Sequence, residues 1–153
     1  MRRSAAPAVT TALVALLALP SLAAAQSADR VPVIPEGQRA SATLTPGIRS
    51  GNIVYASGQL GTSRADTAPT IQSETRRALE NTKRVFEAAG TTMAHTIKCT
   101  VFLVDVKDFG GMNEAYREFF PDSPPARSTV VVAALVVPNA KVEIECMAAI
   151  PSK

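Results

Sequence analysis

Arg127 and Glu143 are the two charged residues of this sequence whose types could do chemistry together. Arg127 follows two prolines and precedes the apolar run Thr129–Val137, and Glu143 lies in Lys141–Glu145, where charged and aliphatic residues alternate. A guanidinium can hold a carboxylate through two parallel hydrogen bonds, and a nearby carboxylate can orient a water or move a proton. The pair therefore predicts a pocket in which Arg127 binds a substrate carboxylate and Glu143 handles a water or a proton. The alternative is an ion pair with a structural role alone.

The two runs that carry these residues are expected to be neighbouring strands. Only Pro138–Ala140 separates Thr129–Val137 from Lys141–Glu145, a spacing typical of the loop in an antiparallel hairpin. The start of the first strand would then lie near the end of the second, which would bring Arg127 and Glu143 within reach of each other. Strand alternation places Glu143 on the face that we do not expect helices to cover.

Other common catalytic arrangements do not occur in the sequence. Ser57 lies between an alanine and a glycine instead of in a Gly-x-Ser-x-Gly turn, and His95 is the only histidine. There is no Cys-x-x-Cys pair, no His-Glu-x-x-His motif, and no glycine-rich phosphate loop followed at once by a helix. The sequence therefore argues against serine hydrolysis, and we expect no metal site.

The elements that must position Arg127 and Glu143 follow from the periodicity of the apolar residues. Short β-favouring runs predict a hairpin, and apolar residues at three- and four-residue spacing predict two helices with a strand between them. Before the two final strands, the predicted elements are Ser41–Ile48, Asn52–Ser57, the helix Ile71–Ala89, His95–Val106 and the helix Phe109–Phe120. This order predicts one α/β (α+β) domain with both helices on one face of a sheet.

The second face of that sheet also needs a cover. Val101–Val104 and Val130–Val137 are apolar at both alternating positions, which is typical of strands buried on both faces. Two helices can cover one face only. Another copy of the chain is the simplest cover for the other face, so we expect a closed homo-oligomer with a pocket at its interface.

The N-terminal residues have the pattern of a secretory signal. Met1–Arg3 supplies a positive start, Ala8–Leu19 an apolar run too short to span a membrane, and Ala23–Ala25 a small-residue cleavage site. We expect cleavage after Ala25, a flexible leader or extended arm over residues 26–39, and a domain over residues 40–153. An uncleaved anchor is the alternative. The mature protein would be periplasmic or secreted, with no membrane attachment.

Removal of the signal would leave a nearly neutral protein. Arg2 and Arg3 account for two of the 16 Lys and Arg residues, which leaves 14 against 13 Asp and Glu residues. Binding to nucleic acid needs a basic surface for the phosphates. We therefore expect no nucleic-acid partner.

Two cysteines could form a bridge in an oxidising compartment. Cys99 and Cys146 both lie inside apolar runs that are expected to be strands. A bridge would require their α carbons to lie about 4.4–6.8 Å apart. The sequence leaves both states open, and we favour two buried thiols.

A series of short motifs resembles the RidA family (YjgF/YER057c/UK114). Each motif is weak alone, but together they follow in order from about residue 40 to residue 150. The segments are Asn52–Gln59, Ala78–Asn81, Ala88–Gly90, Lys98–Asp105, Asn113–Phe120, Pro125–Ser128 and Val142–Glu145. The resemblance implies a chorismate-mutase-like fold of the bacillus type and a homotrimer with three clefts between subunits. It also implies that the protein needs no metal or organic cofactor. The implied substrates are small enamines or imines that carry a carboxylate, and the implied reaction hydrolyses them to 2-keto acids and ammonia.

The same resemblance implies roles for individual residues. Arg127 matches the carboxylate-binding arginine and Glu143 the glutamate that positions water. The implied substrate-binding residues are Ser57, Gly58, Asn113, Tyr116 and Thr129. An iminium carbon is already electrophilic, so orienting the acid and holding one water can suffice for hydrolysis.

Two features depart from the family pattern. Leu44 stands where deaminating members carry a tyrosine, and export would separate the protein from the cytoplasmic enzymes that generate such imines. The leading hypothesis is an exported imine deaminase. The alternative is a non-catalytic trimer that binds a small carboxylate or unfolded chains, and a ribonuclease-like activity ranks last.

Overall fold

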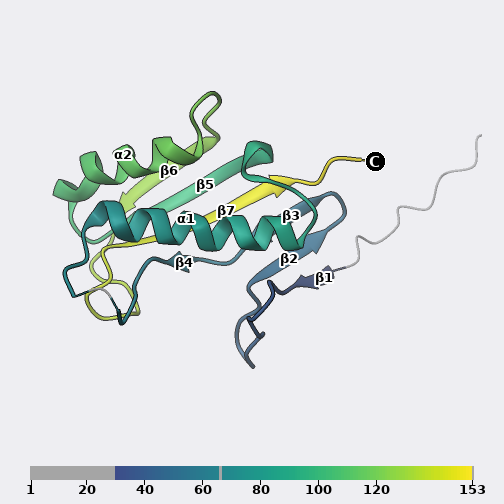
Figure 1. The fold of residues 1–153 in the computed structure, drawn as a ribbon, viewed down its shortest axis with the longest axis horizontal. Coiled ribbons are helices and arrows are strands. Elements are labelled where there is room, and N and C mark those ends of the chain that lie inside the picture. The colour runs from purple at the N-terminus through teal and green to yellow at the C-terminus, as the bar shows by residue number, and fades with distance from the viewer. Residues whose placement is uncertain (1–29, 66, 153) are drawn as a thin grey trace, which may run out of the picture.

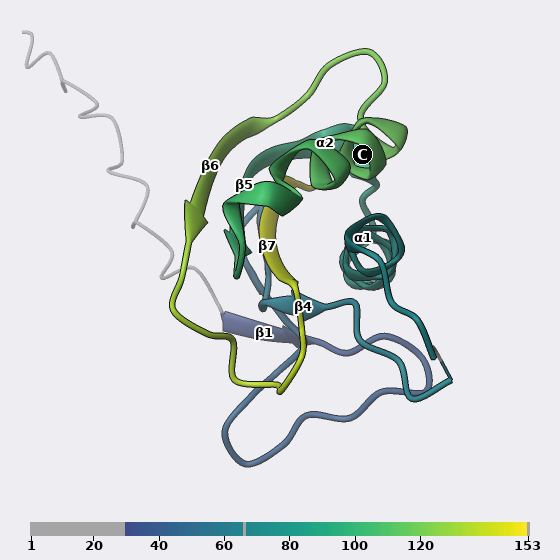
Figure 2. The ribbon, with the colours of Figure 1, turned by 90° about the vertical axis from the view of Figure 1, so that its left-hand side faces the viewer.

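The computed structural model describes residues 30–65 and 67–152, which form a mixed sheet with two helices on one face (Figures 1 and 2). The predicted α+β class, with both helices on the same side, is confirmed. The described strands run in the order β1-β2-β3-β7-β5-β6, and β4 also pairs with β7. Their bounds are β1 Arg30–Val33, β2 Gly47–Ser50, β3 Ile53–Ala56, β4 Gln59–Leu60, β5 Thr96–Leu103, β6 Ala126–Val131 and β7 Val142–Ala149, with helices α1 Ile71–Ala88 and α2 Phe109–Phe119.

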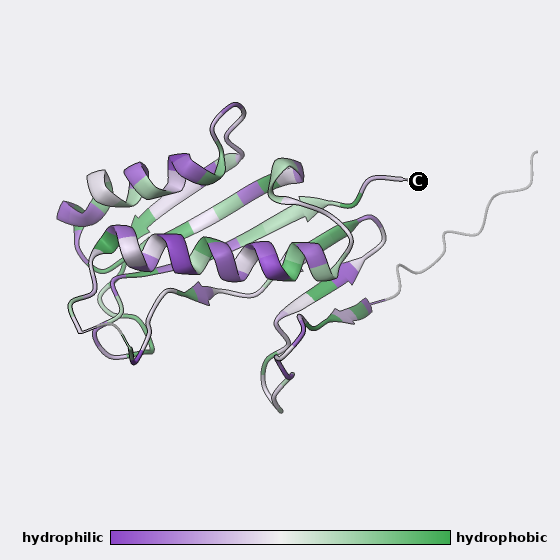
Figure 3. Cartoon of the chain, viewed as in Figure 1, coloured by the Kyte–Doolittle hydropathy of each residue, from purple (hydrophilic) through white to green (hydrophobic). Residues whose placement is uncertain are grey.

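Helix α1 has defined signals at both ends. The Thr70 side chain accepts a hydrogen bond from the backbone N–H of Ser73, and the Ser73 side chain accepts one from the N–H of Thr70, which forms a capping box. Gly90 adopts φ +84 after the last turn, a conformation that glycine reaches without steric cost. The face of α1 that Figure 3 shows outward is largely polar, because its apolar residues turn toward the sheet.

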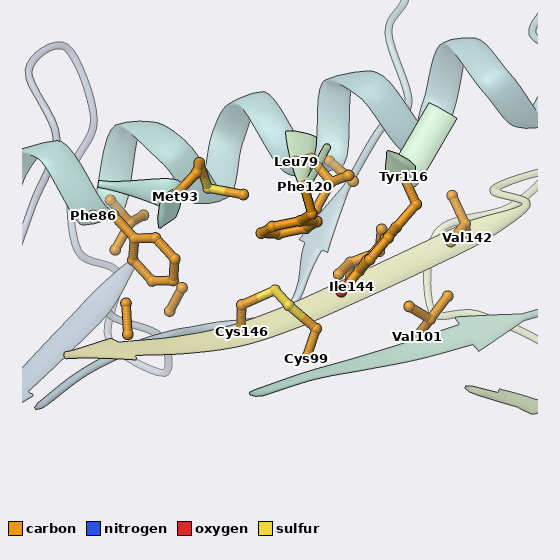
Figure 4. Packing of buried hydrophobic residues seen from close by; sticks show 14 of the residues in the cluster. Leu79, Phe86, Met93, Cys99, Val101, Tyr116, Phe120, Val142, Ile144 and Cys146 are labelled. Carbon is orange, nitrogen blue, oxygen red and sulfur yellow. A yellow bond between two sulfur atoms is a disulfide. The ribbon is translucent and has the colours of Figure 1, made fainter. Parts of the chain in front are cut away.

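The core lies between the helices and one face of β5 and β7. Cys99, Val101 and Leu103 alternate with more exposed residues along β5, and β7 alternates in the same way. Both strands therefore present one row of buried side chains to the helices. Figure 4 shows this layer, with side chains from both helices above the strands. Its members include Leu79, Phe86, Val101, Tyr116, Phe120, Val142 and Ile144.

The predicted hairpin of the two last strands is wrong. Strand β6 pairs with β5 in parallel, and β7 pairs with β5 on its other side in antiparallel orientation. Helix α2 connects β5 to β6, and such a crossover is the usual way to join parallel strands. Residues 132–141 hold no strand and carry the chain past β5 to β7. The apolar run Thr129–Val137 therefore stays beside β5 only to Val132, whose backbone N–H donates to the carbonyl of Leu103 at 2.8 Å.

The preference for two buried thiols is also wrong. Cys99 and Cys146 are direct partners across β5 and β7, and they form a disulfide with their α carbons 4.1 Å apart. Both side chains point to the helix-covered face, where the bridge lies below Phe120 in Figure 4. The sequence does not show that β5 pairs with β7, and this direct cross-strand position is what brings the two cysteines together.

Part of the segment predicted as a leader or an extended arm is an edge strand. Residues Arg30–Val33 form β1, which pairs with β2, and Val33 is buried against the core. The extended form is therefore seen over Arg30–Val33. The predicted signal sequence, residues 1–25, lies outside the described residues. No helix within the described residues is long and apolar enough to cross a membrane.

Candidate functional site

The side chain of Arg127 lies on the helix-covered face at the start of β6. Its register partner on β5 is Cys99, so the two side chains share that face. The guanidinium carbon lies 4.7 Å from the ring centre of Tyr116 and 5.9 Å from that of Phe109. Contacts at these distances are cation–π interactions, which fix the direction of the guanidinium. In the part of the chain that the structure describes, no carboxylate forms an ion pair with Arg127.

Arg127 opens onto a pocket between α2, the proline-rich loop that follows it, and β6. The pocket has a volume of about 440 Å³. Its lining combines two guanidiniums and an amide with aromatic and proline rings, and it includes no acidic residue. The lining residues are Asn113, Tyr116, Arg117, Phe120, Pro121, Pro124, Pro125 and Arg127. Such a pocket suits a small anion with an apolar part.

Two hydroxyl groups near Arg127 are buried without a hydrogen-bond partner among the described residues. They belong to Tyr116 on α2 and Thr129 on β6. Thr129 lies two residues after Arg127 and so points to the same face. Buried hydroxyls are almost always paired, so the hydroxyl of Tyr116, which lines the pocket, is available to a polar group that enters it. Thr129 shares the face of Arg127 but is not among the lining residues. Burial raises the pKa of Tyr116 to about 12, although the charge of Arg127 opposes this rise, and the phenol is neutral.

Glu143 lies on the opposite face of the sheet, near the start of β7. Its register partners are Leu60 on β4 and Phe102 on β5. The side chain packs against the backbone of Gly58, where an added Cβ would collide with Oε1 of Glu143. Gly58 is therefore required for the position that the Glu143 carboxylate adopts.

Ser57 holds a loop beside this carboxylate. Its hydroxyl donates to the carbonyl of Thr45 at 2.6 Å, and its backbone N–H donates to the carbonyl of Pro46 at 2.9 Å. The serine hydroxyl is thus used to anchor the segment before β2. The same segment carries Leu44, whose side chain is about half exposed at 53%.

The predicted residues therefore form two groups within one chain. Arg127 lies with Asn113, Tyr116 and Thr129, and Glu143 lies with Ser57 and Gly58. Strand β5 separates β6 from β7, and the two charged side chains point to opposite faces of the sheet. The expectation that a hairpin brings Arg127 and Glu143 together is wrong for a single chain.

Two polar residues near these groups did not emerge from the sequence. Arg117 lines the Arg127 pocket, and its position four residues after Asn113 on a helix was the available signal. Glu74, on α1, is fully buried and accepts a hydrogen bond from the backbone N–H of Lys141. An acid in the first turn of a helix is normally interpreted as a partner of the helix dipole, so this contact with Lys141 could not be expected from the sequence.

The described part of the chain contains no set of side chains that could bind a metal ion. No group of three or more His, Cys, Asp or Glu side chains comes close enough there to hold a metal ion. The side chains of the two groups can bind an anion at Arg127 and handle a proton or a water at Glu143.

Comparisons with known proteins show the family to which the chain belongs. The family model described as Endoribonuclease L-PSP matches residues 36–150. The chain is 42% identical over 107 residues to the 2-iminobutanoate/2-iminopropanoate deaminase of Dermatophagoides farinae, an alignment that covers 67% of this chain and 82% of that protein. It is also similar to the E. coli YjgF structure, with 32% identity, a TM-score of 0.70 and coverage of 78% of this chain and 98% of that one. The structure of E. coli TdcF with bound serine gives 36% identity, a TM-score of 0.67 and coverage of 76% and 97%.

Proposed function

Because the chain belongs to the Endoribonuclease L-PSP family, which is the YjgF/RidA family that its motifs resemble, we propose that it hydrolyses 2-imino acids to 2-keto acids and ammonia. The observation that carries this proposal is the Arg127 guanidinium, which two aromatic rings hold in a pocket lined by no acid. The deaminase named for the mite relative and the serine bound in TdcF give the proposal its substrate class, a small carboxylate with a nitrogen on C2.

The reaction needs only water as a second reactant. The water oxygen forms a bond to C2 of the imine, and the C2–N bond then breaks. The nitrogen leaves as ammonia with its own hydrogen and two hydrogens from the water, and C2 becomes the ketone carbon. No electrons are transferred, so the chain needs no redox partner for this chemistry.

Arg127 takes the carboxylate of the substrate in this mechanism. A bidentate contact fixes the orientation of the acid, and the adjacent C2 is then held at a defined place in the pocket. The buried hydroxyl of Tyr116 lines the same pocket and can bind a polar atom of the substrate, and Thr129 lies on the same face of β6 as Arg127. Asn113 adds an amide to the same pocket.

Glu143 orients the attacking water and must come from a neighbouring copy. Within one chain it faces away from Arg127, so a complete site requires the uncovered sheet face of one subunit to meet the β6 edge of another. Exposed Tyr55 and Val130 share the face of Glu143, and an interface would bury both. We therefore propose a homotrimer with one cleft at each interface.

Export is a further part of the proposal. The signal-like pattern of residues 1–25 supports it, and so does the Cys99–Cys146 disulfide, because disulfides persist mainly in oxidising compartments. Fractionation of cells that express the full chain tests this proposal. A mature protein shortened by about 25 residues is expected outside the cytoplasm, and a full-length cytoplasmic protein would contradict export.

The activity itself is tested with imino acids generated in situ by an amino-acid oxidase. The expected result is faster release of keto acid than by spontaneous hydrolysis, lost in Arg127→Ala. Wild-type turnover that survives this substitution would contradict the assignment. Binding of small carboxylates without turnover would favour the non-catalytic alternative. In that alternative the site, with Leu44 in place of the family tyrosine, binds ligands but does not hydrolyse them.

A further inference from the structure

The pocket beside Arg127 contains a second guanidinium that the reaction described above does not use. Arg117 lies on α2, four residues after Asn113, and lines the same pocket. We propose that Arg117 determines specificity by binding a second acidic group, so that the preferred substrates are 2-imino acids with an acidic side chain. This inference rests on the proposed function, because Arg127 must hold the carboxylate beside the imine carbon.

The charge of Arg117 is not cancelled by the acids of its own helix. Glu118 accepts hydrogen bonds of 2.8 and 2.6 Å from Arg76 of α1, and Glu114 accepts one of 3.0 Å from Gln72. Both acids therefore turn toward α1. Asp122 follows α2 but does not line the pocket, and within residues 30–65 and 67–152 Arg117 forms no ion pair.

The rest of the pocket suits the methylene chain between the two carboxylates of a dicarboxylic acid. Phe120 and the rings of Pro121, Pro124 and Pro125 line it together with the two guanidiniums. Apolar rings favour methylene carbons, and each guanidinium suits one carboxylate. A volume of about 440 Å³ leaves room for a dicarboxylate of four or five carbons. A substrate with a short neutral side chain would leave Arg117 without an anionic partner.

Arg117 has a competing structural role. It lies in the last turn of α2, where a cation interacts favourably with the negative end of the helix dipole. If this were its only role, replacing Arg117 would lower the stability but would not change the preference for ligands with two carboxylates over ligands with one. Comparison of ligands in the same variant therefore separates the two roles.

Calorimetry with glutarate and butyrate tests the second contact without turnover. Because Arg117 is exposed, its pair with a carboxylate is screened, and we expect wild type to prefer glutarate by about fivefold. The preference should disappear in Arg117→Gln. Arg84→Gln is the matched control, because Arg84 is an exposed arginine of α1 that lines a different pocket. Equal affinities in wild type, or a preference that survives Arg117→Gln, would overturn the inference.

Turnover gives the second readout. Imino acids generated in situ from glutamate and aspartate are compared with those from alanine and 2-aminobutyrate. The ratio of kcat/KM for the acidic over the neutral imino acids should fall about fivefold in Arg117→Gln and stay unchanged in Arg84→Gln. Failure of wild type to hydrolyse any imino acid would contradict the proposed function. If wild type hydrolyses imino acids but the ratio of kcat/KM for acidic over neutral imino acids is the same in Arg117→Gln, only the inference about Arg117 is overturned.

Discussion

The carboxylate of Glu74, in the first turn of α1, accepts a hydrogen bond of 2.8 Å from the backbone N–H of Lys141, just before β7. Glu74 is fully buried, and its backbone carbonyl lies against Gly61, which follows β4. Glu143 lies two residues after Lys141 and pairs with Leu60 of β4. Glu74 therefore holds the start of β7, two residues before Glu143, and its backbone packs closely against the residue that follows β4.

We expect Glu74→Ala to lower the free energy of unfolding by about 2–4 kcal/mol, because it leaves the Lys141 N–H unpaired and opens a cavity. Glu74→Gln keeps an oxygen acceptor and should cost less than about 1 kcal/mol. Urea unfolding measures both. Thr75→Ala is the control, since Thr75 is buried beside Glu74 but its hydroxyl has no partner among the described residues. Equal losses in Glu74→Ala and Glu74→Gln would contradict the assigned hydrogen bond.

Arg127→Lys should lose most of the activity although it keeps the charge. A lysine cannot form the two-pronged contact or stack in the same way on Tyr116. We expect kcat/KM to fall by about 30- to 150-fold, equivalent to about 2–3 kcal/mol for a charge-assisted contact. The measurement is keto-acid release from in situ imines. Wild-type kinetics in Arg127→Lys would show that a point charge suffices and that the fork geometry has no role.

The helices could be predicted closely from the sequence because local signals define them. The predicted helix Ile71–Ala89 ends one residue from the observed α1, and Gly90, which follows it, adopts the positive φ that is common after the end of a helix. The predicted helix Phe109–Phe120 differs from α2 by one residue as well. Periodicity and capping act within a few residues, so a single sequence contains them.

Strand pairing could not be predicted because it depends on distant segments. Proximity along the chain favoured a hairpin of the last two strands, but β5 inserts between them. The same error hid the disulfide, since Cys99 and Cys146 become neighbours only through the pairing of β5 with β7. The residues of the candidate site could be identified from the sequence. The sheet faces on which Arg127 and Glu143 lie could not, because they depend on the order of the strands in the sheet.

Gly58→Ala should impair turnover more than ligand binding. The added Cβ would occupy the place of the Glu143 carboxylate and displace it. The Arg127 that completes the proposed cleft comes from a neighbouring copy, where Tyr116 and Phe109 hold its guanidinium. We expect kcat to fall at least about tenfold, with the affinity for butyrate within about twofold of wild type. Gly110→Ala is the control, because no atom lies within 4 Å of the Cβ position at Gly110. A larger change in butyrate affinity than in kcat would contradict this role of Gly58.

Removal of the disulfide should destabilise the protein without changing its fold. The bridge links residues 47 positions apart, and closing a loop of this length stabilises by about 2–5 kcal/mol. Urea unfolding of Cys99→Ala/Cys146→Ala and of reduced wild type should show losses of this size. A reductant should leave the stability of the double variant unchanged. Equal stability of oxidised and reduced wild type would contradict the bridge.

Tyr116 should make the stability depend on pH in the alkaline range. Burial raises its pKa to about 12, above the value of about 10 in an unfolded chain. The neutral phenol is therefore favoured by folding, so its contribution is complete below about pH 10 and is lost as the pH rises toward 12. Urea unfolding from pH 9 to 12 should show a loss of about 2 kcal/mol that is absent in Tyr116→Phe. The two proteins differ only in this hydroxyl, so the difference between the two curves isolates Tyr116, and parallel curves would contradict the raised pKa.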